Sequence, residues 1–444
     1  MNLWAHQQAD LNRYLKTPSL YNASACGTGK TRTIIEVIKG LQLPTLILAP
    51  KSVCYSAWVM DFKKFAPEVK CSLAAATNRR AAFEEDTMVK ITNVDAITWL
   101  IKPENADLVE QFKGGFLVID EATALKTPTS KRTKAAMKLR PIFAHCTAMS
   151  GTPNPLSILD IWSQMYIVDQ GESLGSSFYR FRSNVCSPVS KGAFTTWTPK
   201  EGITDAVGEI IASKTIRNSR EDCLDLPENL LVTRSIQLSN AHMKLYQDLK
   251  RKAILELKSG TVTAPNAAVL LQKLMQCLSG SIYDEQGVAH SVDSDRYELI
   301  TDLIEERTHT VCFFQYRHQR DELIKLANKR GLAYGLIDGS VTNMFDRANT
   351  INDFQAGKLR VLFGHCASIA HGVTLTTGVA TIFTSGLFNT EHYVQGCARI
   401  HRAGVDHKTE TILISAENTI EPEVWRKLLV KETNMNDLLE LLNG

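Results

Sequence analysis

A glycine-rich run near the N-terminus has the residue types of a phosphate-binding loop. Residues 24–31 read SACGTGKT and lead into a helix-like segment. In such a loop, backbone N–H groups and the start of the next helix cradle the phosphates, a lysine reaches the β- and γ-phosphates, and a hydroxyl binds Mg²⁺. We therefore predict a nucleotide site, with a glycine-rich turn that binds no ligand as the alternative. The predicted ATP-binding residues are Gly27, Thr28, Gly29, Lys30 and Thr31, of which Thr31 also binds the metal.

Ser24 stands where such a loop usually has its first glycine. The position mainly has to leave room for the turn, so a small residue is expected to be tolerated there. We therefore expect Ser24→Gly to leave the affinity for ATP nearly unchanged.

Two adjacent carboxylates supply the second half of a hydrolytic site. Asp120 ends the apolar run GFLVID at residues 115–120, and Glu121 follows it. An aspartate in this place can hold Mg²⁺ through water, and a glutamate can orient and deprotonate the attacking water. Because Lys30 and Asp120 both follow strands of one α/β series, we predict Lys30, Asp120 and Glu121 as catalytic groups and Asp120 as a metal ligand. A surface acidic pair at a strand end is the alternative.

Short apolar runs that alternate with helical patterns must position these groups. The alternation predicts an α/β fold with parallel sheets, in two successive series. Between them, residues 178–227 are rich in Ser, Thr, Gly and Pro and read as a connecting region, and residues 240–279 read as helical. We predict an N-terminal domain over 1–227 and a C-terminal domain over 228–444. The strand-like runs are 44–50, 88–94, 115–120, 145–151, 309–316, 332–338, 359–365, 379–385 and 410–415.

The composition is that of an ordinary globular protein. The 444 residues, 44% hydrophobic and 22% charged, suggest about two or three domains. With 50 basic and 47 acidic residues the net charge is +3, so a nucleic acid would have to bind in a locally basic groove. The ten cysteines are scattered without a C-x-x-C pair, which argues against disulfides and zinc sites. Without a signal peptide or a membrane-length apolar run, we expect a soluble, cytoplasmic protein, bacterial or in a phage-infected host.

Motifs along the whole chain match one family pattern. VIDEATALK is similar to a D-E-A-H-x-x-K-N motif, with Lys126 at the lysine and Thr123 where histidine is usual. Five further segments stand at other motif positions of the same pattern: LWAHQQ, LAPKSV, MSGTPNPL, TIRNSREDCLDLPE and IDGSVTNMFDR. Together these segments resemble the Swi/Snf-type DNA-dependent ATPases of helicase superfamily 2. The resemblance runs from residue 3 to about residue 441 and fits a minimal form of phage or bacterial type.

The segment VQGCARIHRAG carries Gln395, Arg399 and Arg402 in a Q-x-x-x-R-x-x-R pattern. At helical spacing these three side chains share one face. The resemblance implies that Arg399 and Arg402 are catalytic arginine fingers for the γ-phosphate and that Gln395 binds nucleotide. A solvated, charged helix face is the alternative.

The resemblance also implies an architecture and partners. Two RecA-like parallel-sheet lobes would hold ATP and Mg²⁺ in the cleft between them, and duplex or branched DNA would lie across both lobes through phosphate contacts. Gln7, preferred to Gln8 because His6 precedes it, would contact adenine, and Gly372 would join the nucleotide site. The DNA-binding residues implied are Lys51, Ser52, Thr92, Gln315, His365 and Thr374.

Three functions fit these observations. The first is a DNA-stimulated translocase that remodels DNA or DNA–protein complexes, for example by branch migration or fork regression. The second is a helicase that separates strands of DNA or RNA; no strand-splitting hairpin can be identified in the sequence, which counts against it. The third is a nucleotide-gated DNA clamp without turnover, against which the lysine, glutamate and arginine pattern argues.

Overall fold

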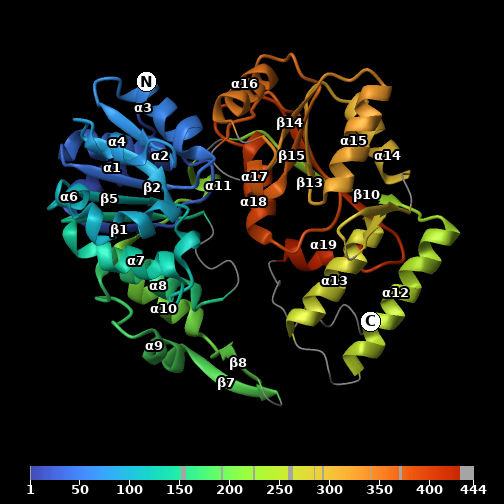
Figure 1. Ribbon diagram of the computed structural model, residues 1–444, viewed down its shortest axis with the longest axis horizontal. Coiled ribbons are helices and arrows are strands. Elements are labelled where there is room, and N and C mark those ends of the chain that lie inside the picture. The colour runs from blue at the N-terminus through green and yellow to red at the C-terminus, as the bar shows by residue number, and fades with distance from the viewer. Residues whose placement is uncertain are drawn as a thin grey trace. The chain divides into compact units, whose positions relative to one another are not determined.

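The chain divides into two compact units, Met1–Asp225 and Leu226–Gly444, each with its own parallel β-sheet (Figure 1). The computed structural model describes residues 2–151, 157–191, 194–223, 226–258, 264–284, 286–292, 295–341, 343–369 and 373–430. Within these ranges, no helix has both the length and the apolar character needed to cross a membrane.

Unit 1 is built on a seven-stranded sheet in the order β3-β4-β2-β5-β6-β1-β9, with every pair parallel. The central strand β2 is buried along its whole length, as expected when helices cover both faces of a parallel sheet. The strands are β1 (Ser19–Asn22), β2 (Thr45–Ala49), β3 (Cys71–Ala74), β4 (Val89–Asn93), β5 (Phe116–Asp120), β6 (His145–Met149) and β9 (Thr215–Ile216).

Two apolar clusters, one on each face of this sheet, hold the helices of unit 1. Alternate residues of one strand serve opposite faces: Leu46 and Leu48 join one cluster, and Ile47 and Ala49 join the other. Helices α1 (Ala5–Lys16), α2 (Lys30–Leu41) and α3 (Met60–Phe65) cover one face. The helices packed into the other cluster are α4 (Arg79–Glu84), α5 (Ile97–Leu100), α6 (Ala106–Glu110), α7 (Lys131–Leu139), α8 (Asp160–Asp169), α9 (Phe178–Val185) and α10 (Ile203–Ile211).

A β-hairpin leaves unit 1 within the segment that the sequence suggested to be connecting chain. Strands β7 (Cys186–Lys191) and β8 (Phe194–Pro199) pair antiparallel and extend away from the body of unit 1 (Figure 1). At the base of the hairpin, the Arg182 guanidinium lies 4.1 Å from the ring centroid of Trp197. The sequence did not predict this hairpin, and whether it acts on DNA strands stays open to test. The Pro and Ser residues of this segment do not form the apolar pattern of a buried strand. The two short strands are stabilised by pairing with each other, which the local sequence does not indicate.

Unit 2 is built on a six-stranded parallel sheet in the order β10-β17-β16-β13-β15-β14. All five strand-like runs of the second series form strands, whereas edge strand β10 was missed because most of its side chains are exposed. The strands are β10 (Asn229–Ile236), β13 (Thr310–Phe314), β14 (Tyr334–Ile337), β15 (Val361–His365), β16 (Ala380–Phe383) and β17 (Thr409–Ala416), with a hairpin of β11 (Ser281–Tyr283) and β12 (Ala289–Ser291).

Helices cover both faces of the second sheet and extend beyond one side of it. The expected helical stretch over 240–279 forms α12 and α13, and the α/β class with two parallel sheets is confirmed. The helices are α12 (Asn240–Lys258), α13 (Ala264–Leu278), α14 (Asp295–Glu305), α15 (Arg317–Lys329), α16 (Met344–Gln355), α17 (Cys366–Ile369), α18 (Thr390–Ile400) and α19 (Glu421–Leu429).

Candidate nucleotide site and DNA contacts

The glycine-rich loop joins β1 to α2 at the carboxyl edge of the first sheet. Gly27 and Gly29 have φ angles of 90° and 78°, in the left-handed region that favours glycine. A Cβ atom on Gly29 would lie 2.3 Å from Gln7 Nε2 and would displace the end of that side chain, so the backbone angle is the stronger reason for glycine here. Helix α2 starts at Lys30, with half-buried Thr31 in its first turn. The loop thus has the geometry of a phosphate-binding loop.

The Lys30 ammonium group lies against its own loop. Its Nζ donates to the carbonyl oxygens of Ser24 at 2.7 Å and Ala25 at 3.0 Å. Both acceptors are backbone groups, and the side chain is half-buried. A phosphate bound at the start of α2 would compete with these carbonyl oxygens for the ammonium group, since hydrogen bonds between charged groups are the stronger ones.

Gln7 lies on the loop and Gln8 does not. Gln7 is 4% exposed, accepts from Trp4 N at 3.0 Å and donates from Nε2 to the Gly29 carbonyl at 3.1 Å. His6 Nε2 lies 2.8 Å from the Thr28 carbonyl oxygen. Gln8 bonds instead to the exposed side chain of Asn12. The position of Gln7 agrees with the choice made from the sequence, and its contact with adenine stays a prediction.

Asp120 lies at the same sheet edge as the loop, because the carboxyl ends of parallel strands share one edge. Strand β6 separates β5 from β1. The Asp120 carboxylate accepts from Trp58 Nε1 at 2.9 Å and, through its other oxygen, from Glu121 N at 3.1 Å. Burial and then the Asp120 charge raise the pKa of the Cys54 thiol to about 12. The Asp120 carboxylate itself places negative charge at this edge of the sheet.

Two features of this carboxylate pair were not predicted. Trp58 is fully buried and also orients Asp120. A buried tryptophan usually finds an acceptor for its N–H, which is the signal that could have identified it. Glu121 has a φ of 52°. A non-glycine residue in that region costs about 1–3 kcal/mol, and such strain clusters at functional sites.

Gln395, Arg399 and Arg402 gather around the end of α18 in unit 2. Arg399 is 5% exposed and donates to the Gln395 carbonyl at 2.8 Å. Arg399 and Arg402 each donate from Nη1 to the Val373 carbonyl at 3.2 Å. Because α18 ends at Ile400, Arg402 lies in the turn after the helix. The expectation of three residues on one helix face was wrong for Arg402, although tertiary contacts bring both guanidinium groups to one carbonyl.

The six residues with implied DNA contacts differ in accessibility. Lys51 and Thr374 are exposed, and Ser52 is half-buried in the turn after β2. Thr92 is 1% exposed and donates its hydroxyl to the Ala74 carbonyl at 2.8 Å, so this strand position presents no hydroxyl to a DNA backbone. Gln315 donates to the Gly386 carbonyl at 2.7 Å, and His365 Nε2 lies 3.1 Å from the Gln315 carbonyl oxygen. Gly372 lies outside the described residues.

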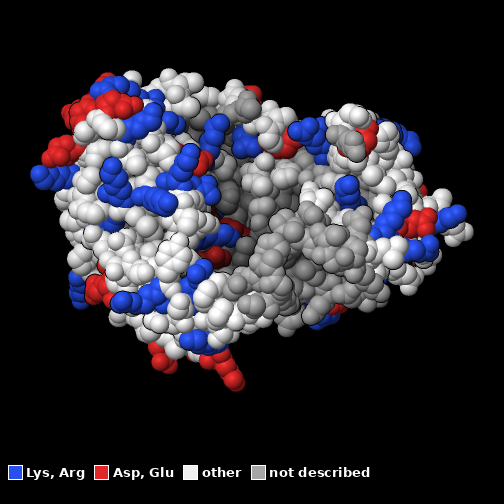
Figure 2. All heavy atoms as spheres, turned by 60° about the horizontal axis from the view of Figure 1, so that its bottom comes forward, with Lys and Arg blue, Asp and Glu red and all other residues white. Residues whose placement is uncertain are grey.

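Helix α7 carries a basic stripe that the sequence interpretation did not single out. Lys131, Lys134 and Lys138 are exposed and, at helical spacing, share one face. Among the described residues, none of the three has an ion-pair partner. Figure 2 shows basic side chains dispersed over this side of unit 1, at the left of the view, with acidic ones mostly towards its rim. Such a stripe is suited to phosphate groups.

Comparisons with known proteins identify related sequences over most of the chain. The model of the SNF2-related domain matches residues 9–280, and that of the helicase conserved C-terminal domain matches residues 295–404. Putative protein p41 of Acyrthosiphon pisum secondary endosymbiont phage 1 is 26% identical, over 94% of this chain and 93% of the relative. An uncharacterized ATP-dependent helicase of Mycoplasma pneumoniae is also 26% identical, over 94% of this chain but 40% of its own length.

Two further similarities concern a longer relative and a solved structure. Mouse chromodomain-helicase-DNA-binding protein 1-like is 23% identical over 93% of this chain and 47% of its own length. The chain thus spans less than half of the Mycoplasma and mouse relatives. The Sulfolobus solfataricus SWI2/SNF2 ATPase core in complex with dsDNA aligns with a TM-score of 0.46 and 20% identity, covering 100% of this chain and 95% of that one.

Proposed function

We propose an ATP-driven motor that moves along duplex DNA as the function of this chain, which belongs to the SNF2-related family of helicase-type ATPases. The observation that carries the proposal is the contact between Gln7 and the Gly29 carbonyl, at 3.1 Å. This hydrogen bond holds Gln7, the proposed adenine contact, against the loop. The loop has two glycines with left-handed backbone angles and the lysine of a phosphate-binding loop. A turn with only a structural role would not need this combination.

Each residue of unit 1 has a separate task in the proposed hydrolysis. Lys30 and the N–H groups at the start of α2 bind the phosphates. Thr31 and Asp120 offer the oxygen ligands that Mg²⁺ prefers, and Trp58 holds the Asp120 carboxylate in place. The metal, when bound, neutralises charge on the phosphate oxygens. Glu121 orients the attacking water and accepts its proton.

In unit 2, Arg402 is the better candidate for the arginine finger. Both arginines bond to the Val373 carbonyl, but Arg399 is 5% exposed and also bonds to the Gln395 carbonyl within α18, so it supports that helix. Arg402 is only half-buried. An arginine finger contributes a factor of about 10³–10⁵ in rate, or roughly 4–7 kcal/mol of barrier. We therefore assign the transition-state role to Arg402 and a supporting role to Arg399.

The proposed DNA contacts are to phosphates, so that binding depends strongly on salt and weakly on base sequence. Lys51, Thr374 and the α7 lysines are exposed candidates. Each phosphate neutralised on duplex DNA adds about −0.9 to the slope of log K against log salt. Branch migration and fork regression are the remodelling reactions that we propose for such a motor.

One assay tests the proposal. ATP turnover is measured with duplex DNA, single-stranded DNA or RNA, beside displacement of a triplex-forming strand. We expect turnover stimulated by duplex DNA and displacement of the third strand, with little unwinding. Stimulation by RNA alone would refute the proposal.

The β7–β8 hairpin favours strand separation as a second candidate function. It is an antiparallel ribbon of the kind that could wedge between the strands of a duplex, a candidate that could not be identified in the sequence. Replacing residues 187–198 by a short Gly-Ser loop tests this idea on a forked DNA substrate. A wedge function predicts loss of unwinding with ATP turnover retained, whereas a wild-type protein that unwinds no fork excludes it.

A further inference from the structure

The chain that leaves unit 1 lies along the phosphate-binding loop. We call residues 215–223 the connector; they comprise β9 and helix α11 (Arg220–Cys223). Strand β9 pairs in parallel with β1. Beyond the two strands the pairing continues into the loop, because Ala23 N donates to the Ile216 carbonyl at 2.8 Å and Ala25 N to the Asn218 carbonyl at 2.9 Å. Loop and connector thus share one run of backbone hydrogen bonds.

Side chains of the connector bind the same loop. The backbone N–H and the Nδ2 of Asn218 each donate to Ser24 Oγ at 3.1 Å. Arg220 Nε donates to the Cys26 carbonyl at 2.7 Å. Ser24 is 1% exposed, and its own N–H donates to Asn22 Oδ1 at 3.0 Å. The expectation that Ser24 merely leaves room in the turn is therefore incomplete, because its hydroxyl accepts two hydrogen bonds from the connector.

Helix α1 binds both partners through one polar face. His6 and Gln7 contact the loop, as described above. Asp10 Oδ2 accepts from Asn218 Nδ2 at 2.8 Å, and Arg13 donates to the carbonyls of Ser213 at 2.7 Å and Thr215 at 2.9 Å. The helix therefore contacts both the loop and the connector through neighbouring residues of one face.

We propose that Asn218 and Arg220 are positioning residues that couple nucleotide binding in the loop to the connector. The inference rests on the proposed function for its ligand. Lys30 bonds to the carbonyls of Ser24 and Ala25, and the connector bonds to other groups of the same two residues. Phosphate draws the lysine from those carbonyls, so the loop segment that holds the connector changes its bonding when nucleotide binds. Without the hydrogen bonds of Asn218, nucleotide binding in the loop should no longer change the connector.

Hydrogen exchange of the full chain, followed by mass spectrometry, tests this coupling. Peptides covering residues 20–31 and 212–223 are compared with and without a non-hydrolysable ATP analogue and Mg²⁺. In the wild type, nucleotide slows exchange in both. In Asn218→Ala, we expect the loop to keep its protection, while the protection of the connector falls at least about 5- to 10-fold, because the side chain loses its hydrogen bonds to both Ser24 Oγ and Asp10 Oδ2. Ser24→Ala removes the hydrogen-bond acceptor of Asn218 and should have the same effect on the connector. It therefore still tests the coupling if Asn218→Ala fails to fold.

A matched control and three adverse outcomes complete the test. Asn12→Ala makes the same chemical change on the exposed side of α1, where Asn12 bonds only to Gln8 among the described residues, and should behave as the wild type. The coupling is refuted if nucleotide protects the wild-type loop but not its connector, or if both variants keep the full response of the connector. Failure of the analogue to bind the wild type refutes the coupling and the proposed function together.

Discussion

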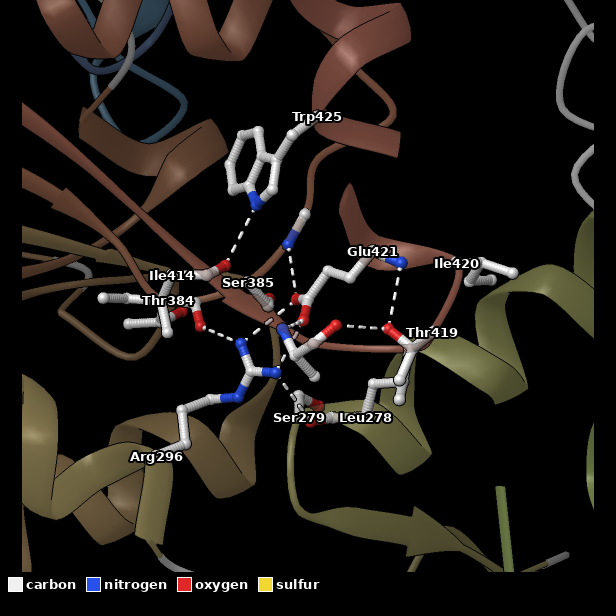
Figure 3. Close-up of polar contacts among 12 residues, drawn as sticks. Leu278, Ser279, Arg296, Thr384, Ser385, Ile414, Thr419, Ile420, Glu421 and Trp425 are labelled. Atoms are coloured by element: carbon white, nitrogen blue, oxygen red, sulfur yellow. Dashed lines mark hydrogen bonds and ion pairs between the residues drawn. The ribbon is translucent and has the colours of Figure 1, made fainter. Parts of the chain in front are cut away.

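A buried ion pair between Arg296 and Glu421 holds the elements of unit 2 together, and its removal gives the sharpest stability prediction (Figure 3). The two side chains are 3% and 0% exposed, and their atoms approach to 2.7 and 3.1 Å. Both side chains also bond to backbone groups. These are the carbonyls of Leu278 and Thr384 for Arg296, and the N–H groups of Gly386 and Ala416 for Glu421.

Arg296→Met leaves the Glu421 carboxylate buried with two backbone N–H groups but no cation. Breaking a buried pair from one side costs about 3–5 kcal/mol, because the remaining charge is uncompensated. Glu421→Gln places an amide donor against a donor of Arg296 and against the N–H of either Gly386 or Ala416, and should cost a similar amount. In the double variant Arg296→Met/Glu421→Gln no charge remains, so we expect the summed cost to exceed the measured one by about 1–3 kcal/mol.

Pulse-labelling hydrogen exchange across a urea series reads the two units separately, peptide by peptide. The predicted loss falls on peptides of unit 2, with unit 1 unchanged. Arg330→Met is the matched control: Arg330 makes ion pairs with Glu298, Asp302 and Glu305 at the surface, where such pairs contribute at most about 1 kcal/mol each. A loss below about 1 kcal/mol for Arg296→Met, or one no larger than that of Arg330→Met, would refute the reasoning.

Three further predictions concern catalysis and pH. Lys30→Ala and Arg402→Ala should both abolish ATP turnover. Nucleotide titration should show strongly weakened binding only for Lys30→Ala. Normal ATP hydrolysis by Arg402→Ala would refute the assignment of Arg402 as the arginine finger. Trp58→Phe deletes the 2.9 Å hydrogen bond to Asp120. We expect a roughly 10- to 100-fold weaker apparent affinity for Mg²⁺ in turnover assays. An unchanged Mg²⁺ affinity would contradict a positioning role for Trp58. Burial lowers the pKa of His318 to about 4 from its ordinary 6.5, so the unfolded chain binds the proton more readily. The free energy of unfolding should therefore fall by up to about 3 kcal/mol between pH 6.5 and 4. His318→Gln should remove this contribution to the pH dependence of that free energy, as measured by urea unfolding.

The arrangement of secondary structure could be predicted wherever the local pattern is strong. All nine strand-like runs contain or overlap strands of the two sheets, because buried parallel strands are continuous apolar segments flanked by turns. The β7–β8 hairpin and the edge strand β10 escaped prediction for the converse reason. Their residues are largely polar or exposed, and pairing with a neighbour, not burial, makes them strands.

The residue types of the proposed nucleotide site could also be predicted from sequence, since a phosphate loop needs glycine, lysine and a hydroxyl at fixed spacing. Which side chains support them could not. Trp58 precedes Asp120 by 62 residues and Asn218 follows Ser24 by 194. Thr92 sits on a strand whose pairing buries its hydroxyl, and Arg402 falls just after the last turn of α18. Spacing along the chain carries no information on such contacts.

Short-range periodicity and residue type were enough to predict the α/β class, and they support the proposed chemistry of the loop, the carboxylates and the arginine motif. Long-range contacts were needed to find that Ser24 is a hydrogen-bond acceptor for the connector, that Trp58 orients Asp120, and that Arg402 meets Arg399 at one carbonyl. A buried polar group must find a partner wherever the fold provides one. That partner is set by the stacking of strands and helices from distant segments of the chain, which no local pattern records.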